Sequence, residues 1–171
     1  MTEVRSARPD DLPRLAEIER VADEMFASVG IVGLPPAPPM QEYAAAAALL
    51  VAGDPAVGFA RIELPCGEAY LDQLSVHPSE MRHGVGTALL EAAVRWARDK
   101  GHESIALATF RDVPWNAPFY ARRGFVETAA DTPGLRAVAE HERQLRMDRF
   151  APRVLMRRTT SHTEISPAGG G

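Results

Sequence analysis

The chain has 171 residues, the size of one ordinary domain, which is long enough to bury a core without disulfides or a structural metal. Its 19 basic and 23 acidic residues give a formal net charge of -4 at pH 7, so we expect no nucleic acid partner. The single cysteine, Cys66, excludes an internal disulfide and fits a reducing compartment. We expect a cytoplasmic protein without a membrane partner, because the N-terminus lacks a signal-peptide pattern and the most apolar run, residues 43–53, is shorter than the roughly 18 to 20 residues of a bilayer span.

The N-terminal part predicts a helix followed by a loop. Pro9, Asp10 and Asp11 supply a rigid entry and negative charge where a helix begins. Apolar residues then recur at helical spacing and form one face: Leu12, Leu15, Ile18, Val21, Ala22 and Met25. The segment GIVGLPPAPPMQ, residues 30–41, is too rich in proline and glycine for regular structure and predicts an exposed loop of the kind that often lines binding sites.

The middle of the chain predicts an antiparallel meander and a crossover. Residues 48–52, 57–64 and 68–76 are β-branched or alternating runs separated by the turns GDPA and PCG. A helix ending at Gly101 follows, with a buried stripe of Leu89, Leu90, Ala93, Val94 and Ala97. The run SIALATF, residues 104–110, is the next strand. A strand, helix and strand of these lengths imply parallel or neighbouring pairing, so the fold class is α/β with a mixed sheet.

The C-terminal part predicts smaller elements. PWNAPFYARRGF indicates a short helix closed by Gly124, with a strand near residues 125–127. Residues 135–147 have a helical pattern, and RVLMRR, residues 153–158, forms a last strand. We therefore expect one domain over residues 1–158 and a disordered tail over residues 159–171, which has almost no apolar residue to bury.

The stretch MRHGVGTALLEAA places Gly84 and Gly86 immediately before the second helix. A turn at a helix N-terminus exposes unpaired N–H groups at the positive end of the helix dipole, which suits an anion. A tight connector that needs glycine for its geometry is an equally valid interpretation of the two glycines alone. The turn is not a P-loop, because the chain has no Gly-Lys pair, nor a dinucleotide fingerprint, because Leu89 stands where the third glycine is required.

The order LDQLSVHPSEMRHGVGTALLEAAVRWARDKG, LATF and NAPFYARRGF resembles the GNAT superfamily of acyl-CoA-dependent N-acetyltransferases, whose pyrophosphate motif is Arg/Gln-x-x-Gly-x-Gly/Ala. The resemblance covers residues 2–127, and residues 153–158 match the closing strand of the family. It implies a mixed, mostly antiparallel central sheet flanked by helices. It also implies an enzyme that transfers an acetyl group from acetyl-CoA, its co-substrate, to a primary amine on a small molecule or peptide, by direct attack in a ternary complex.

The resemblance also implies site residues. Leu74, Ser75 and Val76 match the strand that pairs with the pantetheine arm. The turn that wraps the pyrophosphate is matched by Arg82, His83, Gly84, Val85, Gly86 and Thr87. Tyr120 matches the general acid that protonates the CoA thiolate, and Asn116, Pro118 and Phe119 lie near the path of the thiol.

The sequence departs from the family pattern at two positions. Met81 replaces the first Arg or Gln of the motif, so one side-chain contact to the pyrophosphate is missing. Val113 stands seven residues before Tyr120, where the family commonly has Asn, and Asn116 is a candidate substitute one helical turn later.

The transfer needs a neutral amine, and an alkylamine with a pKa of about 10.4 is protonated at pH 7, so a base is required. Asp72 is the best candidate, because on an alternating strand it would share a face with Tyr70 and Leu74. A strand carboxylate paired with an arginine is an equally weighted interpretation of Asp72. A bulge would turn Asp72 away and bring Gln73 inward. Two carboxylates are weaker candidates: Glu68 and Glu24.

Other chemistries find less support. The five histidines and one cysteine have no metal-ligand spacing, so we expect no metal, and no G-x-S-x-G turn supports a hydrolase. A non-catalytic acyl-CoA sensor and an interaction protein that uses residues 135–147 stay open as alternatives. The acceptor should bind between residues 26–40 and the turn after Phe110, and the acidic total charge favours a small cationic amine. A homodimer through an edge strand or the late helix also stays open.

Overall fold

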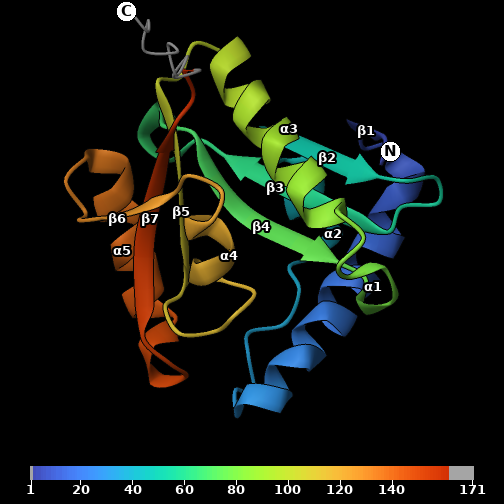
Figure 1. Ribbon diagram of the computed structural model, residues 1–171, viewed down its shortest axis with the longest axis horizontal. Coiled ribbons are helices and arrows are strands. Elements are labelled where there is room, and N and C mark those ends of the chain that lie inside the picture. The colour runs from blue at the N-terminus through green and yellow to red at the C-terminus, as the bar shows by residue number, and fades with distance from the viewer. Residues whose placement is uncertain (1, 162–171) are drawn as a thin grey trace, which may run out of the picture.

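The computed structural model describes residues 2–161 and contains a seven-stranded sheet of order β1-β2-β3-β4-β5-β7-β6 (Figure 1). Its strands are β1 (Val4–Ser6), β2 (Ala48–Ala52), β3 (Gly58–Glu63), β4 (Tyr70–Val76), β5 (Ser104–Phe110), β6 (Val126–Thr128) and β7 (Arg153–Thr159). Its α-helices are α1 (Leu12–Glu24), α2 (Met40–Ala44), α3 (Val85–Asp99), α4 (Ala117–Ala121) and α5 (Pro133–Gln144). Every neighbouring pair of strands is antiparallel except β4 and β5, so the predicted mixed, mostly antiparallel α/β sheet is confirmed.

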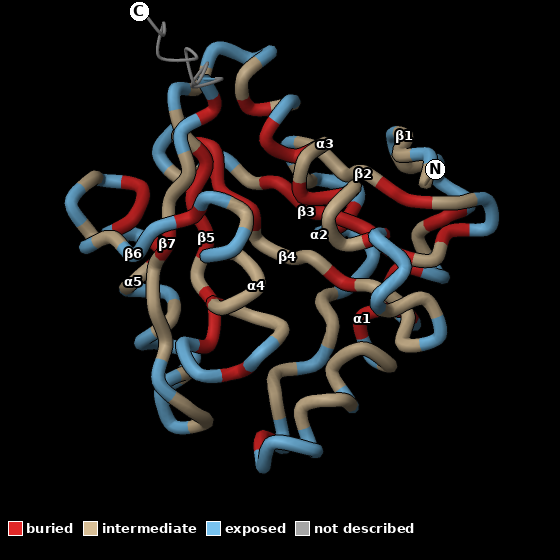
Figure 2. The backbone as a smooth tube through the Cα atoms, in the orientation of Figure 1, coloured by how far each residue is buried: buried red, intermediate tan, exposed pale blue. Residues whose placement is uncertain are grey.

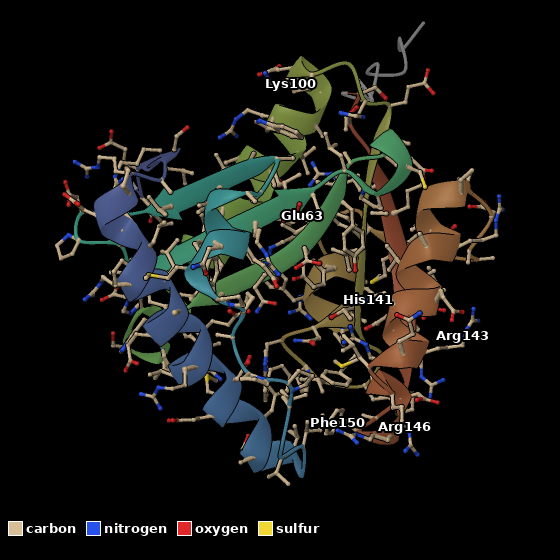
Figure 3. All side chains as sticks on the ribbon, turned by 180° about the vertical axis from the view of Figure 1, so that it is seen from behind. Glu63, Lys100, His141, Arg143, Arg146 and Phe150 are labelled. Atoms are coloured by element: carbon tan, nitrogen blue, oxygen red, sulfur yellow. The ribbon has the colours of Figure 1, made fainter. Side chains whose placement is uncertain are left out.

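The helices cover the two faces of the sheet unequally. Helices α3 and α4 lie on the face seen in Figure 1, and α1, α2 and α5 lie on the face seen from behind in Figure 3. Figure 2 shows the buried residues gathered along the central strands and the inner sides of these helices. The main core lies under α3, where Leu89, Leu90 and Ala93 are fully buried against β3 and β5. Helix α5 packs Leu135 and Val138 on Tyr70 and Ala106, so its apolar face is already covered.

Helix α1 begins where the sequence predicted, after a 3-10 turn at Pro9–Asp11. The Asp11 carboxylate accepts a hydrogen bond from the Arg8 N–H at 2.7 Å and forms an ion pair with Arg5 at 2.8 Å. Only the first half of the predicted apolar face enters the core, with Leu15 and Ile18 fully buried. Ala22 and Met25, farther along the same face, are half-buried because α1 extends past the sheet and lines a cleft there.

Strand β4 contains a β-bulge at Asp72. Arg61 of β3 pairs with Gln73, but the next residue, Ile62, pairs with Leu71, so Asp72 is the extra residue. Leu71 and Leu74 pack in the core under α3, whereas the Asp72 side chain contacts Arg61 on the α1 face. The expectation that Asp72 shares a face with Leu74 is therefore wrong, because the bulge interrupts the alternation on which it depended.

Strands β4 and β5 pair at one point only, near the start of each strand. The parallel pairing is confined to Tyr70 and Ala106, and the Ala106 N–H donates to the Ala69 carbonyl at 3.1 Å. Beyond this point the two strands diverge (Figure 1). Residues 72–76 of β4 therefore have backbone groups on this side that β5 does not satisfy.

Two predicted loop boundaries need correction. The segment predicted as an exposed loop, residues 30–41, contains Ile31, which is buried with Phe110 and Val113, and its last residues begin α2. The predicted tail begins too early, since Thr159 belongs to β7 and the buried Thr160 hydroxyl donates to the His102 carbonyl at 2.6 Å. Residues 162–171 of the predicted tail lie outside the described residues. Among residues 2–161, no helix combines the length and hydropathy needed to span a membrane.

Candidate active site

The divergence of β4 and β5 opens a cleft of about 1710 Å³ that reaches both faces of the sheet. We divide it into two parts. The glycine-turn half is lined by α4 and by five residues of the turn: Met81, Arg82, Gly84, Gly86 and Thr87. The acidic half is lined by α1, α2, the ends of β3 and β4, and α5. Because α3 and α1 cover opposite faces of the sheet, a ligand that spans both halves must pass between the two strands.

The turn before α3 presents its backbone to the cleft. Arg82 has φ +66 and Gly84 has φ +81, a left-handed conformation in which glycine carries no steric cost. Gly84 is the N-cap of α3, so the N–H groups of the first turn have no intrahelical acceptor. A Cβ on Gly86 would lie 3.5 Å from Phe119 Cζ, in ordinary van der Waals contact. The turn has the geometry of an anion site at a helix N-terminus.

Not every residue predicted for this turn faces the cleft with its side chain. Arg82, Gly84, Gly86 and Thr87 line it. The Val85 side chain is buried in the core under the helix, and His83 points outward, 3.4 Å from Glu80 and mostly exposed. His83 and Val85 can therefore contribute only backbone groups.

Strand β4 brings Leu74, Ser75 and Val76 to the same cleft. The Ser75 side chain is 3% exposed, and its hydroxyl accepts a hydrogen bond from Gln73 Nε2 at 2.8 Å. The backbone of these residues, at the diverging edge, is the part that a ligand can reach.

Tyr120 of α4 lies at the junction of the two halves. Its ring makes edge contacts with Phe119 at 5.2 Å and Phe125 at 5.7 Å between centroids. Burial raises the pKa of Tyr120, so its hydroxyl stays protonated at physiological pH and can act as a proton donor. Asn116 also lines the cleft, and its Oδ1 accepts a hydrogen bond from the Phe110 N–H at 3.4 Å. Pro118 is the second residue of α4 and does not line the cleft.

Arg123 is a site residue that the sequence analysis missed. Its Nε donates to the Thr87 hydroxyl at 2.8 Å and its Nη1 to the Phe119 carbonyl at 3.0 Å. The guanidinium lies 3.8 Å above the centroid of the Phe119 ring. Arg123 therefore places a fixed positive charge beside the turn, and the ARRG run after Tyr120 was the available signal.

In the acidic half, Arg61 organises several side chains. It forms ion pairs with Asp72 and, at 3.8 Å, with Glu42, and it lies 5.5 Å from the centroid of the Tyr43 ring. The Tyr43 hydroxyl donates a hydrogen bond to Glu19, and burial raises the pKa of the Glu19 carboxyl. Asp72 is therefore a strand carboxylate paired with an arginine, which was one of the two interpretations of this residue from the sequence.

Asp23, one helical turn after Glu19 on α1, is the second residue that was missed. It is half-buried and lines the cleft, and its carboxylate forms no ion pair or hydrogen bond with any residue between 2 and 161. Burial and the neighbouring Glu19 raise the pKa of Asp23 to about 7. The i, i+4 spacing of two acids on one face of a predicted helix was the signal that could have found it.

The weaker base candidates lie elsewhere. Glu68 accepts hydrogen bonds from the Gly134 N–H at 2.6 Å and the Thr132 hydroxyl at 2.5 Å, and so caps α5. Glu24 is an exposed partner of Arg20 and does not line the cleft. Across residues 2–161 no three His, Cys, Asp or Glu side chains are grouped closely enough to hold a metal ion.

The acetyltransferase (GNAT) family model matches residues 15–125, more than half of the chain, so the chain belongs to the GNAT family of acetyltransferases. This match includes α1 from Leu15 onward, the glycine turn and Tyr120.

Solved structures of acetyltransferases share the fold. The ribosomal-protein-S18-alanine N-acetyltransferase from Escherichia coli has a TM-score of 0.64 and 20% identity, and the match covers 97% of this chain and 98% of that protein's chain. The PaiA N-acetyltransferase from Thermoplasma acidophilum, in complex with coenzyme A, matches 93% of this chain over 99% of its own, with a TM-score of 0.63 and 19% identity. The N-acetylglutamate synthase from Neisseria gonorrhoeae, complexed with coenzyme A and N-acetyl-glutamate, matches 94% of this chain with a TM-score of 0.67 and 18% identity, but the chain spans only 35% of that protein. At these identities the likeness shows the fold alone.

Proposed function

We propose that the protein transfers an acetyl group from acetyl-CoA to a primary amine by direct attack in a ternary complex. The observation that carries the proposal is that the open helix start at α3 and Tyr120 of α4 line one cleft, where β4 and β5 diverge. Membership of the GNAT family supports it.

Acetyl-CoA would enter through the glycine-turn half. The N–H groups of residues 82–87 would bind the pyrophosphate, and the free backbone edge at Leu74, Ser75 and Val76 would pair with the amides of the pantetheine arm. Met81 supplies no charged contact, but Arg123 lies at the turn and provides a guanidinium for a phosphate oxygen. Phe119 and Asn116 would lie beside the thiol end.

The chemistry follows from this placement. The amine nitrogen attacks the thioester carbonyl carbon, and a backbone N–H of residues 74–76 stabilises the oxyanion that forms. The intermediate collapses with cleavage of the C–S bond, and Tyr120 donates its proton to the departing thiolate. The amine loses its proton to Asp72, directly or through water. The ion pair with Arg61 fixes the position of the Asp72 carboxylate.

A non-catalytic acyl-CoA sensor is the second candidate, favoured by Met81 in place of the charged motif residue. Two measurements distinguish the transferase from the sensor. The first is release of free CoA thiol from acetyl-CoA over a panel of primary amines, and the second is calorimetry of acetyl-CoA binding. Thiol release with an amine supports the transferase, whereas acetyl-CoA binding without turnover on any amine supports the sensor.

The free, exposed Cys66 is consistent with a reducing compartment, and we propose the cytoplasm as the location.

A further inference from the structure

The acidic half of the cleft carries more negative than positive side chains. Its carboxylates come from five elements and are Glu19, Asp23, Glu42, Glu63, Asp72 and Glu142. The cationic side chains in this half are Arg61 and Arg153, with His141 on the facing side of α5. In Figure 3, His141 lies on the inner side of α5, toward the opening of the sheet, while Arg143 points outward.

Both arginines are already engaged. Arg61 is 9% exposed and is paired with Asp72 and Glu42. Its Nε has no hydrogen-bond partner but is completely enclosed, so a ligand in the cleft cannot reach it. Arg153 pairs with Glu142 at 2.8 Å and lies 4.5 Å from the centroid of the Phe110 ring. Each guanidinium is therefore already paired with a carboxylate of the cleft.

Three carboxyl groups remain without an ion-pair partner among the described residues: Glu19, Asp23 and Glu63. Glu19 is 5% exposed and already accepts the Tyr43 hydroxyl. Asp23 is more accessible and faces the cleft from α1 with no partner. A cation that enters this half finds an available carboxylate, whereas a carboxylate meets an excess of negative side chains, which disfavours its binding.

The rest of the wall is apolar. Phe26 makes ring contacts with Phe110 and Trp115, each at 5.5 Å between centroids. The prolines of residues 35–39 and the exposed side chains of Leu64 and Leu145 extend this wall to the mouth of the cleft. An apolar wall beside an acidic floor matches a ligand with an apolar body and a cationic head.

We propose that the acceptor is a primary amine on an apolar body with no carboxylate beside the amino group, and that Asp23 is the specificity-determining residue that attracts its ammonium. This inference rests on the proposed acetyl transfer, because it identifies the acceptor of that reaction. It excludes free α-amino acids as good acceptors.

Matched acceptors test the substrate class. 2-Phenylethylamine and phenylalanine differ only by the carboxylate, and phenylalaninamide restores the bulk without the charge. We expect kcat/KM at pH 8 to be about 100-fold higher for 2-phenylethylamine than for phenylalanine. The kcat/KM of phenylalaninamide should be close to that of 2-phenylethylamine. Calorimetry of the three compounds with CoA-saturated protein measures their affinities independently of turnover, and we expect the affinities to follow the same order as kcat/KM. Equal kcat/KM or equal affinity for phenylalanine overturns the inference while leaving acetyl transfer intact. Turnover of no amine, with acetyl-CoA still bound, overturns the proposed function, and the inference then fails with it.

Paired variants test the residue. Asp23→Asn should raise the KM for 2-phenylethylamine about tenfold. It should also reduce the ratio of kcat/KM for 2-phenylethylamine over phenylalanine, with little effect on acetyl-CoA affinity. Glu24→Gln is the matched control, because Glu24 is adjacent on α1 but lies outside the cleft. An unchanged preference in Asp23→Asn, or an equal loss of preference in Glu24→Gln, overturns the role of Asp23.

Discussion

The Asp72 carboxylate is held by Arg61 across a β-bulge, on the face of the sheet opposite Leu74. The bulge turns Asp72 toward α1 and the acidic half of the cleft, and the edge of β4 beyond Tyr70 is free toward β5. One irregularity in β4 thus accompanies both features of the site, a fixed carboxylate and an open backbone edge.

Asp72→Asn should lower kcat at least about tenfold if Asp72 accepts the amine proton. It should also lower the free energy of unfolding by about 1–3 kcal/mol, because the buried Arg61 loses a charged partner. Steady-state kinetics and urea unfolding measure the two effects. Glu42→Gln removes the other, exposed partner of Arg61 and should have little effect on kcat or on the free energy of unfolding. Lower stability with an unchanged kcat would leave Asp72 with a structural role only.

Tyr120→Phe should lower kcat about 100-fold and leave acetyl-CoA affinity within about twofold, because the ring contacts with Phe119 and Phe125 survive and only the proton donor is removed. Since burial raises the pKa of Tyr120 above its ordinary value of 10.0, the wild-type rate should show no loss from Tyr120 ionisation up to pH 9. Turnover and calorimetry check both statements. A full wild-type kcat in the variant removes Tyr120 from the mechanism.

Met81→Arg restores the charged first position of the motif at a residue that lines the cleft. We expect acetyl-CoA to bind about five- to tenfold more tightly, by one charge-assisted hydrogen bond, with kcat unchanged. The gain should shrink at high salt, because the turn is exposed and screening is effective there. Met81→Leu, which adds no charge, is the control. An equal gain in Met81→Leu would point to packing and not to a phosphate contact.

The sequence was sufficient for the parts of the fold that follow from local pattern. The strand at residues 104–110, the helix ending before Gly101 and the turn at Gly84 follow from alternation, helical spacing and glycine placement, each of which acts within a few residues. The bulge at Asp72 has no comparable signal, because it depends on the register against β3. Ile31 could not be predicted as buried, since its neighbours Phe110 and Val113 come from a distant segment.

The same distinction applies to the site. Residues of the glycine turn could be predicted as a group, but which side chains face the cleft could not, as His83 and Val85 show. Asp23 lies on a helix whose pattern predicted only a core face. It becomes a cleft residue because α1 extends beyond the sheet, which is a tertiary property.

Burial and the neighbouring Glu19 raise the pKa of Asp23 from 3.8 to about 7. A carboxyl with a raised folded-state pKa contributes its stability fully below the unfolded value, and this contribution is lost as pH rises through about 7. Asp23→Asn should therefore be more stable than the wild type at pH 8, by on the order of 1–2 kcal/mol after solvent screening, and should show no such gain at pH 4. Urea unfolding at both pH values measures this difference.

Activity should change in the opposite direction. The ratio of kcat/KM for wild type over Asp23→Asn cancels the titration of the amine itself. That ratio should rise as pH increases from 6 to 8, because Asp23 attracts an ammonium only when it is ionised. A variant that is more stable and less active at pH 8, with both differences vanishing at acidic pH, is the result expected of a carboxylate kept in the cleft for function at the expense of stability. A flat ratio across this range would show that the charge on Asp23 does not assist the acceptor.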